Sequence, residues 1–249
     1  MASSLLRSAE LIMRQMIPVE RVFAHHEAST LLSPGIRTFK TRRSRITPTQ
    51  ERALISYAHY LIGMRSEPLS VESDWQMPGA PIVVEIGFGT GASTVAMAEH
   101  DQATALLAID VHTPGIGDLL DKAGAAQLTN LRVMEADALT VLERMVLPES
   151  LSGVRSYFPD PWPKVRHHKR RLVQPPIAQL LYSRLLPGGY WHIATDWDEY
   201  AESIKCVMAE ESGWIGGQIE RPADRPVTMF EARALSEGRT ITDLLYTKA

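Results

Sequence analysis

The amino-acid sequence predicts an α/β fold in which a doubly wound, mostly parallel sheet carries helices on both faces. Short apolar runs alternate with segments of helical periodicity between about residue 79 and residue 211. A glycine-rich turn follows the first apolar run, and acidic residues follow several of the others. Strands and helices that alternate in this way form parallel sheets, which bind ligands beyond the carboxyl ends of their strands.

The part of the chain before this core is expected to contain a basic arm and one helix. Residues up to 46 show no sustained periodicity and end in a basic run, which predicts a flexible arm. The segment "TPTQERALISYAHYLI" predicts a helix with Thr47 as N-cap, Pro48 in the first turn and Glu51 at the capping-box position. The expected divisions are therefore an arm, a helix with its connecting loop, and a core domain, at residues 1–46, 47–78 and 79–249.

Within the core, five strands alternate with five helices. The strands are expected at residues 82–87, 105–110, 131–137, 153–158 and 190–195. The helices are expected at residues 91–100, 117–127, 138–146, 177–186 and 199–211. Each strand is a short apolar run, and each helix has a longer amphipathic pattern. The residues that directly follow the strands are therefore the first candidates for a functional site.

Charge is unevenly distributed along the 249 residues. The chain has 26 Lys and Arg against 29 Asp and Glu, which gives a formal net charge of −3. Two runs, at 37–45 and 164–171, each hold five Lys or Arg and no acid, so the rest of the chain is strongly acidic. Such clusters predict contacts with phosphate groups, although a solvated loop or tail would also explain either run taken alone.

Several classes of protein are excluded by composition. Cys206 is the only cysteine, which excludes a disulfide framework and a cysteine-rich zinc site and favours a reducing compartment such as the cytoplasm. No apolar stretch approaches the about 18 residues that cross a membrane. The histidines at 25–26 and 167–168 are adjacent, and neighbouring side chains on extended backbone point in opposite directions, so no metal site is expected. The sequence is compatible with both a monomer and a homodimer.

The turn after the first strand, in "VVEIGFGTGAS", has two interpretations. Gly87-x-Gly89-x-x-Ala92, followed by an acid 18 residues after Ala92, matches a dinucleotide fingerprint. Glu85-x-Gly87-x-Gly89-x-Gly91 resembles the first motif of class I methyltransferases, which bind S-adenosylmethionine. Glu85 favours the second interpretation, because a buried carboxylate needs a partner and a cationic methionine moiety would provide one.

Two further acids follow the second and third strands. Asp110 fits either kind of cofactor, because both present a ribose diol at the end of the second strand. Asp137 lies where class I methyltransferases contact the adenine amino group. It also precedes a predicted helix, so it is equally a candidate N-cap, and the two roles are compatible.

The fourth strand leads into "YFPDPWPKVRHHKRR", residues 157–171. Each proline restricts its own backbone and that of the residue before it, which holds Asp160 and Trp162 in set directions. "PDPW" resembles the short Asp/Asn-Pro-Pro-aromatic turn that amino-group and ring-nitrogen methyltransferases often place beside the methyl donor. A ring nitrogen such as N7 of guanine is already a lone-pair nucleophile, so its methylation needs alignment and an acceptor for a developing positive charge. Asp160 would be that acceptor. Trp162 would pack on the base or close the pocket, unless it is simply a core residue.

These segments together resemble the bacterial-type tRNA (guanine-N7-)-methyltransferase family. "FPDPWPKVRHHKRRL" is similar to its signature, and "EIGFGTG", "VHTPGIG", "TDWDEYAE" and "RPVTMFEARALSEGRTITDLLY" are similar to its other motifs. The resemblance extends from about Thr47 to the end of the chain. It implies a Rossmann-like class I methyltransferase fold with a seven-stranded sheet. It also implies methyl transfer from S-adenosylmethionine to N7 of a variable-loop guanine in tRNA.

The resemblance also implies roles for individual residues. The cofactor would be bound by Glu85, Gly87, Gly89, Gly91, Asp110, Asp137 and Asp160, with Asp160 also in the catalytic position. The substrate would be contacted by Lys164, Asp196, Thr228, Met229, Phe230 and Glu231. The basic run would add phosphate contacts from Arg166, His167, His168, Lys169, Arg170 and Arg171.

Three positions depart from the family pattern. Asp110 replaces a common glutamate, Val165 replaces a common lysine, and Ala234 stands where a glycine often follows Arg233. None of these changes removes a proposed catalytic group. An NAD-dependent oxidoreductase and a non-catalytic RNA-binding protein are the alternatives, but the first does not explain Glu85 and the second does not explain the acids at four strand ends.

Overall fold

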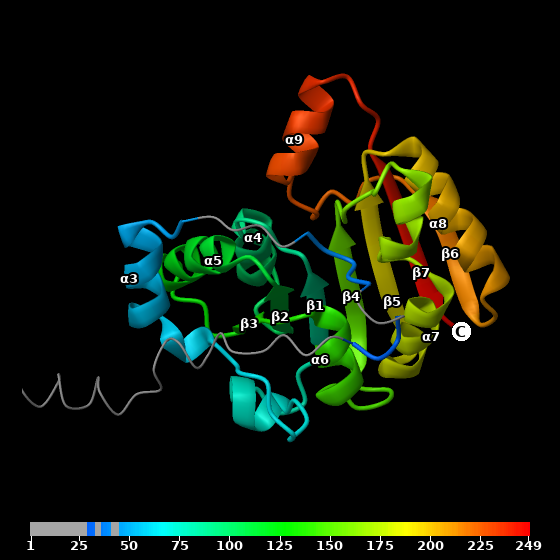
Figure 1. The fold of residues 1–249 in the computed structure, drawn as a ribbon. Helices are drawn as coiled ribbons and strands as arrows, with labels where there is room; N and C mark the ends of the chain where they lie inside the picture. Colours follow the sequence, from blue (N-terminus) through cyan, green and yellow to red (C-terminus); the bar gives the residue numbers. More distant parts are fainter. Residues whose placement is uncertain (1–28, 33–35, 41–44) are drawn as a thin grey trace, which may run out of the picture.

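The computed structural model describes residues 29–32, 36–40 and 45–249, and its centre is a seven-stranded sheet (Figure 1). The strand order is β3-β2-β1-β4-β5-β7-β6. Neighbouring strands from β3 to β5 are parallel, whereas β7 is antiparallel to both β5 and β6. The strands are β1 (Ile82–Ile86), β2 (Ala105–Asp110), β3 (Leu131–Glu135), β4 (Leu151–Tyr157), β5 (Leu185–Thr195), β6 (Trp214–Ile219) and β7 (Thr242–Lys248). The predicted doubly wound, mostly parallel sheet is thus confirmed.

Helices connect the strands and lie on both faces of the sheet (Figure 1). The α-helices are α3 (Pro48–Ser56), α4 (Ala92–His100), α5 (Thr113–Ala125), α6 (Ala138–Arg144), α7 (Pro175–Arg184), α8 (Asp198–Glu210) and α9 (Met229–Ser236). Short helical turns occupy Ala58–Tyr60, Val71–Trp75 and Val165–Arg170. No helix in the described ranges is long and apolar enough to cross a membrane.

The central strands are buried on both faces, as a parallel sheet requires. Val83 belongs to an apolar cluster with residues of α3, α4 and α5, whereas Val84 belongs to a second cluster with residues of α6, α7 and α8. Successive side chains of a strand point to opposite faces, so these two valines assign the two layers of helices to opposite sides.

Several predicted boundaries shift because of tertiary contacts. The first helix ends at Ser56 instead of continuing to residue 62, since Leu61 pairs with Val133 of β3 and the Tyr60 hydroxyl donates to two backbone carbonyls near the end of α5. α5 begins four residues early, with Pro114 in its first turn, where a missing N–H costs nothing. β5 begins at Leu185 because this residue pairs with Leu151.

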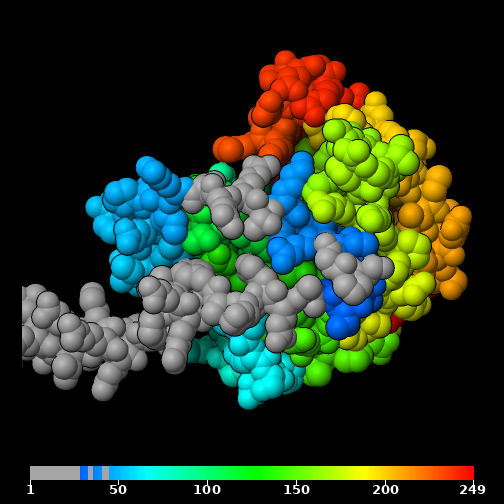
Figure 2. Space-filling view, in the orientation of Figure 1, coloured from blue at the N-terminus to red at the C-terminus, as the bar shows by residue number. Residues whose placement is uncertain are grey.

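Most of the predicted N-terminal arm lies outside the described residues, but two short pieces of it contact the body. The Thr30 hydroxyl donates to Glu143 at 2.9 Å, and Leu31 and Leu32 pack against the core. The carbonyl of Thr38 accepts a hydrogen bond from the Trp162 indole at 3.3 Å. In the space-filling view, blue N-terminal residues accordingly lie beside the yellow-green segment that follows β4 (Figure 2).

Candidate functional site

The glycine-rich turn follows β1 and leads into α4. Gly87, Gly89 and Gly91 have φ values of +80°, +63° and +73°, a region that residues with a Cβ rarely adopt. A Cβ on Gly91 would also lie 2.5 Å from a methyl carbon of Leu119 on α5. The turn therefore needs glycine at Gly91 for its conformation and for its close packing.

Glu85 is a buried carboxylate next to this turn. It is 2% exposed, and its Oε2 atom has no hydrogen-bond partner among the described residues. Burial raises the pKa of Glu85 to about 7, although the hydroxyl of Thr94 and the charge of Arg155 act in the opposite direction. A buried oxygen without a partner is costly, so this site is suited to a ligand that brings a donor or a positive charge.

Asp110, at the end of β2, holds the glycine turn in place. Its carboxylate accepts hydrogen bonds from the backbone N–H groups of Gly89 at 3.1 Å, Val111 at 2.7 Å and His112 at 3.1 Å. Burial raises the pKa of Asp110, and these three bonds partly offset that effect. A carboxylate oxygen accepts more than one hydrogen bond, so Asp110 keeps the capacity to accept from a ribose diol.

Glu135 is a site residue that the sequence interpretation missed. It lies opposite Asp110 in the register of β2 and β3, and it accepts a hydrogen bond from the Thr113 hydroxyl. Its other carboxylate oxygen is buried and unpartnered within the described part of the chain, and burial raises the pKa of Glu135. The predicted strand runs to Asp137, whereas β3 ends at Glu135, so only the observed end of the strand identifies Glu135 as the acid beside Asp110.

The structure gives Asp137 the role of a helix cap. It is 7% exposed and accepts a hydrogen bond from the backbone N–H of Leu139 at 3.1 Å, in the first turn of α6. The predicted contact with adenine stays a prediction, because one capping bond does not use all acceptor positions of a carboxylate.

The turn after β4 is strained and carries Asp160. Phe158 and Trp162 have φ values of +54° and +47°, which are unusual for aromatic residues and cost conformational energy. Asp160 has a side chain that is 25% exposed, and its carboxylate lies 3.6 Å from the ammonium group of Lys40. Because β4 adjoins β1 in the sheet, this turn emerges beside the glycine turn.

Trp162 forms part of the wall of this region. It is 4% exposed, and the cationic groups of Lys40 and Arg170 lie over its ring at 5.0 and 4.9 Å from the centroid. Both distances are typical of cation–π contacts. Its low exposure agrees best with the interpretation of Trp162 as a core residue.

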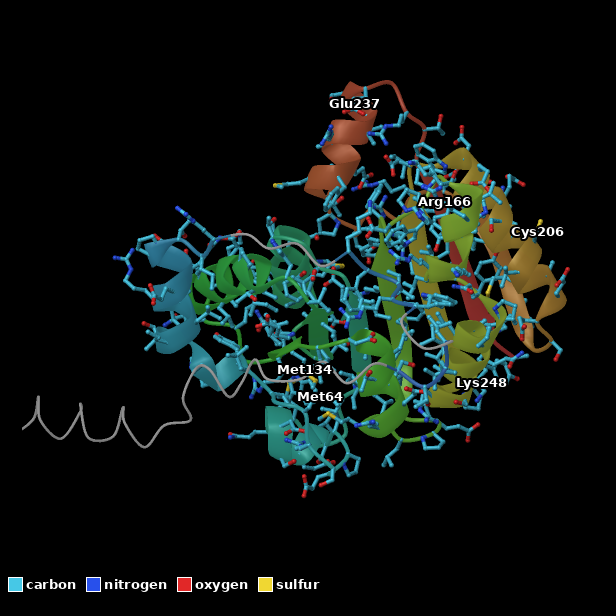
Figure 3. The ribbon with its side chains drawn as sticks, in the orientation of Figure 1. Met64, Met134, Arg166, Cys206, Glu237 and Lys248 are labelled. Carbon is cyan, nitrogen blue, oxygen red and sulfur yellow. The ribbon has the colours of Figure 1, made fainter. Side chains whose placement is uncertain are left out.

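The basic run that follows is mostly on the surface. Lys164, Arg166 and Lys169 are exposed, and the histidines and Arg170 are half-buried. Arg166 lies on the side of the molecule toward which β4 and β5 run, whereas Lys248 lies at the opposite side (Figure 3). Val165, the departure from the family pattern, is 81% exposed, so an apolar side chain interrupts a cationic surface.

Arg171 is the exception, and the prediction that it contacts phosphates does not hold in this structure. It is 2% exposed, and its guanidinium forms an ion pair with Glu199 and donates to the Pro161 carbonyl at 3.0 Å. The guanidinium also lies 4.8 Å from the centroid of the Tyr200 ring. All of these partners belong to the protein itself, so the buried Arg171 connects the proline turn to α8 instead of facing an RNA.

The predicted substrate residues near the C-terminus fall into two groups. Met229 and Phe230 are 63% and 49% exposed and are available to a ligand. Glu231 is 1% exposed and pairs with Arg225 at 2.7 Å and Arg221 at 2.9 Å, so the predicted direct contact of Glu231 with a substrate is not compatible with this structure.

Thr228 and Asp196 have partners within the protein, and Ala234 is buried in it. The Thr228 hydroxyl accepts from the N–H of Glu231 in a capping box that starts α9. Asp196 forms an ion pair with Arg239 and keeps an 18% exposed side chain. Ala234 is fully buried within α9, so the helix continues regularly through the position where the family often has glycine.

The first turn of α9 contacts the glycine turn across about 140 residues of sequence. The Thr90 hydroxyl lies 3.9 Å from the sulfur of Met229. A Cβ on Gly89 would lie 3.4 Å from the ring of Phe230. The structure thus brings the glycine turn and the exposed residues of α9 together at one end of the sheet.

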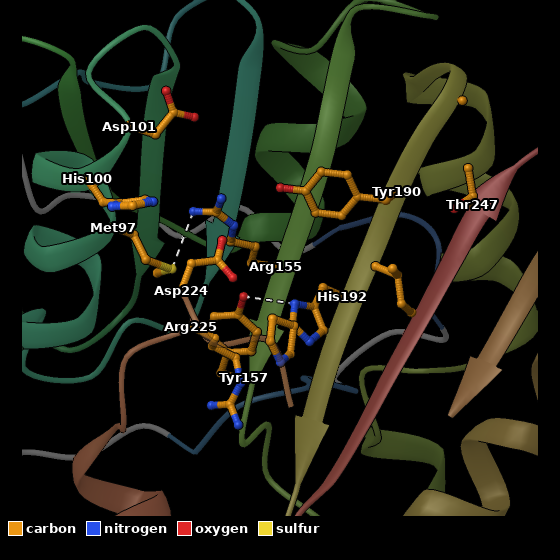
Figure 4. A pocket seen from close by; sticks show the side chains of 13 residues that line it. Met97, His100, Asp101, Arg155, Tyr157, Tyr190, His192, Asp224, Arg225 and Thr247 are labelled. Carbon is orange, nitrogen blue, oxygen red and sulfur yellow. Dashed lines mark hydrogen bonds between the residues drawn. The ribbon is translucent and has the colours of Figure 1, made fainter. Parts of the chain in front are cut away.

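A cavity of about 600 Å³ lies elsewhere, against β4, β5 and β7 (Figure 4). Its lining includes Arg155, Tyr157, Tyr190 and His192, and none of the residues predicted for the site. No cluster of three or more potential metal ligands occurs within residues 29–32, 36–40 and 45–249.

Comparison with known proteins identifies the family. Residues 79–244 match a protein family described as "Putative methyltransferase". A tRNA (guanine-N(7)-)-methyltransferase of Burkholderia ambifaria is 42% identical over 239 residues, which cover 93% of this chain and 92% of that protein. One of Streptomyces avermitilis is 45% identical over 217 residues, 85% of this chain and 74% of that protein.

A solved structure agrees on the fold. The crystal structure of the 16S rRNA methyltransferase KamB superposes with a TM-score of 0.54 and 17% identity, covering 76% of this chain and 98% of that one. The sequence relatives and the family match together cover both the core domain and the segments that precede and follow it. This chain therefore belongs to the tRNA (guanine-N(7)-)-methyltransferase family.

Proposed function

We propose that the protein transfers the methyl group of S-adenosylmethionine to N7 of a guanine in the variable loop of tRNA. The relatives named above support the reaction. The observation that carries the proposal in this chain is the half-buried carboxylate of Asp160 in the turn after β4, beside the glycine turn of β1 and adjoining a cationic surface. A tRNA substrate and a single cysteine favour a cytoplasmic location.

The acids at the carboxyl ends of β1, β2 and β3 fit the cofactor. Glu85 offers a buried acceptor without a partner, which suits the cationic amino-acid part of the cofactor. Asp110 suits the ribose diol, and Glu135 supplies another buried acceptor nearby. When bound, S-adenosylmethionine supplies an electrophilic methyl group on a sulfonium centre. The glycines of the turn have no Cβ, which would allow the backbone to approach the cofactor closely.

Asp160 would orient the guanine and stabilise the charge that develops on it. The base presents N–H donors at N1 and N2, and a carboxylate accepts two such bonds in one plane. Methylation at N7 needs no general base, because N7 carries a lone pair and no proton. A fixed negative charge beside the purine favours the cationic product-like state, which is the role of preorganised electrostatics.

A methyl-transfer assay on unmodified tRNA tests the proposed reaction. We expect label from S-adenosylmethionine to enter a tRNA transcript, and to be absent from a transcript in which the variable-loop guanines are replaced by adenine. Calorimetry should show binding of S-adenosylhomocysteine and no binding of NAD. Equal labelling of the two transcripts would show that the assigned target is wrong, and binding of NAD alone would favour the oxidoreductase alternative.

Charge reversal of Arg166 and Lys169 is expected to weaken tRNA binding, because both are exposed cations near Asp160. Each lost phosphate contact should lower the slope of log affinity against log salt concentration by about one unit. Filter binding between low and moderate salt measures this slope. Lys205→Glu is the matched control, since Lys205 lies on α8 and pairs with Glu202. An unchanged slope in the double variant would mean that the cluster does not contact phosphates.

A further inference from the structure

Arg225 is the centre of a buried ionic cluster between the sheet and α9. It is 3% exposed and lies in the segment between β6 and α9. Its guanidinium pairs with Glu231 at 2.7 and 3.0 Å and with Asp243 of β7 at 2.9 Å. Both carboxylates are buried, at 1% and 2% exposed. One planar guanidinium thus connects two acids from separate elements, a geometry that lysine does not reproduce.

The cluster is anchored to the centre of the sheet. The His192 ring on β5 contacts Asp243 at 2.8 Å through Nε2. Its Nδ1 atom lies 3.1 Å from the hydroxyl of Tyr157 on β4, and Figure 4 shows this second contact. The Arg225 guanidinium lies 5.4 Å from the centroid of the Tyr157 ring. Burial raises the pKa of Asp243, but the contacts with His192 and Arg225 outweigh that effect, so its pKa is lowered. Three strands therefore fix the position of Arg225.

The other side of the cluster determines where α9 begins. Glu231 occupies the third position of the helix and completes the capping box with Thr228. The two residues between them, Met229 and Phe230, are the ones that reach the glycine turn. A displacement of Glu231 would therefore displace both contacts, because all four residues belong to the same helical turn.

We propose that Arg225 is a positioning residue, which acts through Asp243 and Glu231 to hold the first turn of α9 against the glycine turn. Glu231 then serves the site by orienting α9 and not by touching the RNA. The part of this inference that concerns tRNA rests on the proposed function. The part that concerns the seating of α9 does not.

A distance measurement tests the seating directly. Spin labels are attached at Glu99→Cys on α4 and Leu235→Cys on α9, both exposed positions, in a Cys206→Ser background. We expect a narrow distance distribution for the parent and a clearly broader or shifted one for Arg225→Met. Arg233→Met is the matched control, because Arg233 is an exposed arginine of α9 that pairs with Glu237. An unchanged distribution in Arg225→Met would overturn the proposal.

Glu231→Gln is a second test, in case the Arg225→Met variant does not fold. Removal of Arg225 leaves two buried acids without their counter-charge, which can destabilise the whole protein. Glutamine at 231 keeps the shape of the side chain and leaves the pairing of Arg225 with Asp243 intact. The proposal expects the label distances to broaden in this variant as well, with an unfolding midpoint close to that of the parent. Parent-like distances would count against it.

A double-mutant cycle on tRNA affinity separates positioning from direct contact. We expect Arg225→Lys and Glu231→Gln each to weaken tRNA binding by about tenfold, and the double variant also by about tenfold, because residues that act as one unit are not additive. A hundredfold loss in the double variant would show that Glu231 contacts the RNA independently. If the proposed function is wrong, the parent itself fails to bind tRNA, while the label distances still report on Arg225.

Discussion

Asp160→Asn is expected to lower kcat for methyl transfer to tRNA by about 100- to 1000-fold, the range found when one preorganised charge-stabilising group is removed. Asparagine keeps the shape of the side chain but loses the negative charge. It also presents an NH₂ group where an acceptor is needed, so it would oppose the N–H donors of guanine. Single-turnover methylation with saturating tRNA and S-adenosylmethionine measures the effect on the chemical step.

Two controls show whether the loss of kcat in Asp160→Asn comes from the interaction with the base. Asp121→Asn, on the exposed side of α5, should leave kcat unchanged. S-adenosylhomocysteine should bind Asp160→Asn within about tenfold of the parent, because most of the cofactor contacts come from other strand ends. A loss of cofactor affinity as large as the loss of kcat would mean that Asp160 acts on the cofactor and not on the base.

Glu85→Gln is expected to stabilise the protein without cofactor at pH 8.5 and to have little effect at pH 5. The folded-state pKa of about 7 lies above the value of 4.5 for an exposed glutamate. Because the pKa is higher in the folded state, folding favours the protonated side chain. The free energy of unfolding therefore falls as the pH rises from the unfolded-state pKa of 4.5 through the folded-state pKa of about 7. The difference between the two pKa values corresponds to about 3 kcal/mol of unfolding free energy.

Urea unfolding at the two pH values measures this difference. Glu99→Gln, at an exposed position of α4, the helix that follows the glycine turn, is the matched control and should show no such pH dependence. Equal stabilities of the Glu85→Gln variant and the parent at pH 8.5 would mean that the Glu85 carboxylate already has a partner in the protein without cofactor.

The same carboxylate should make cofactor binding depend on pH. A charged Glu85 is the form that pairs with a cationic ligand, so affinity for S-adenosylhomocysteine should fall by about tenfold for each pH unit below 7. Calorimetry between pH 5.5 and 8.5 measures the slope, which Glu85→Gln should lack. If the variant keeps the slope, another group is responsible.

The sequence predicted the core strands and the cofactor side of the site well, for local reasons. The run at 82–87 is apolar and short, and the three glycines that follow it require a turn. Asp110 ends β2 and Asp160 follows β4, at the edge where a parallel sheet brings the ends of its strands together. These features depend on a few neighbouring residues, so their pattern is visible in the chain itself.

The C-terminal part could not be predicted to the same degree. β7 inserts between β5 and β6 and runs antiparallel to both, an arrangement set by pairing with strands distant in sequence. α9 begins with a capping box at Thr228 that the sequence contains, but its orientation depends on Asp243. Local propensity contributes little to such long-range choices.

By itself, then, the sequence determined the order of strands and helices in the core and the acids that follow the strands. Only the tertiary structure decided which charged side chains face solvent. Arg170 and Arg171 are neighbours in the chain, yet Arg171 is buried because Glu199, 28 residues away, pairs with it. Glu231 is buried because Arg225 and Arg221 compensate its charge. A charged group is stable inside a protein only with such partners, and their location is a property of the fold.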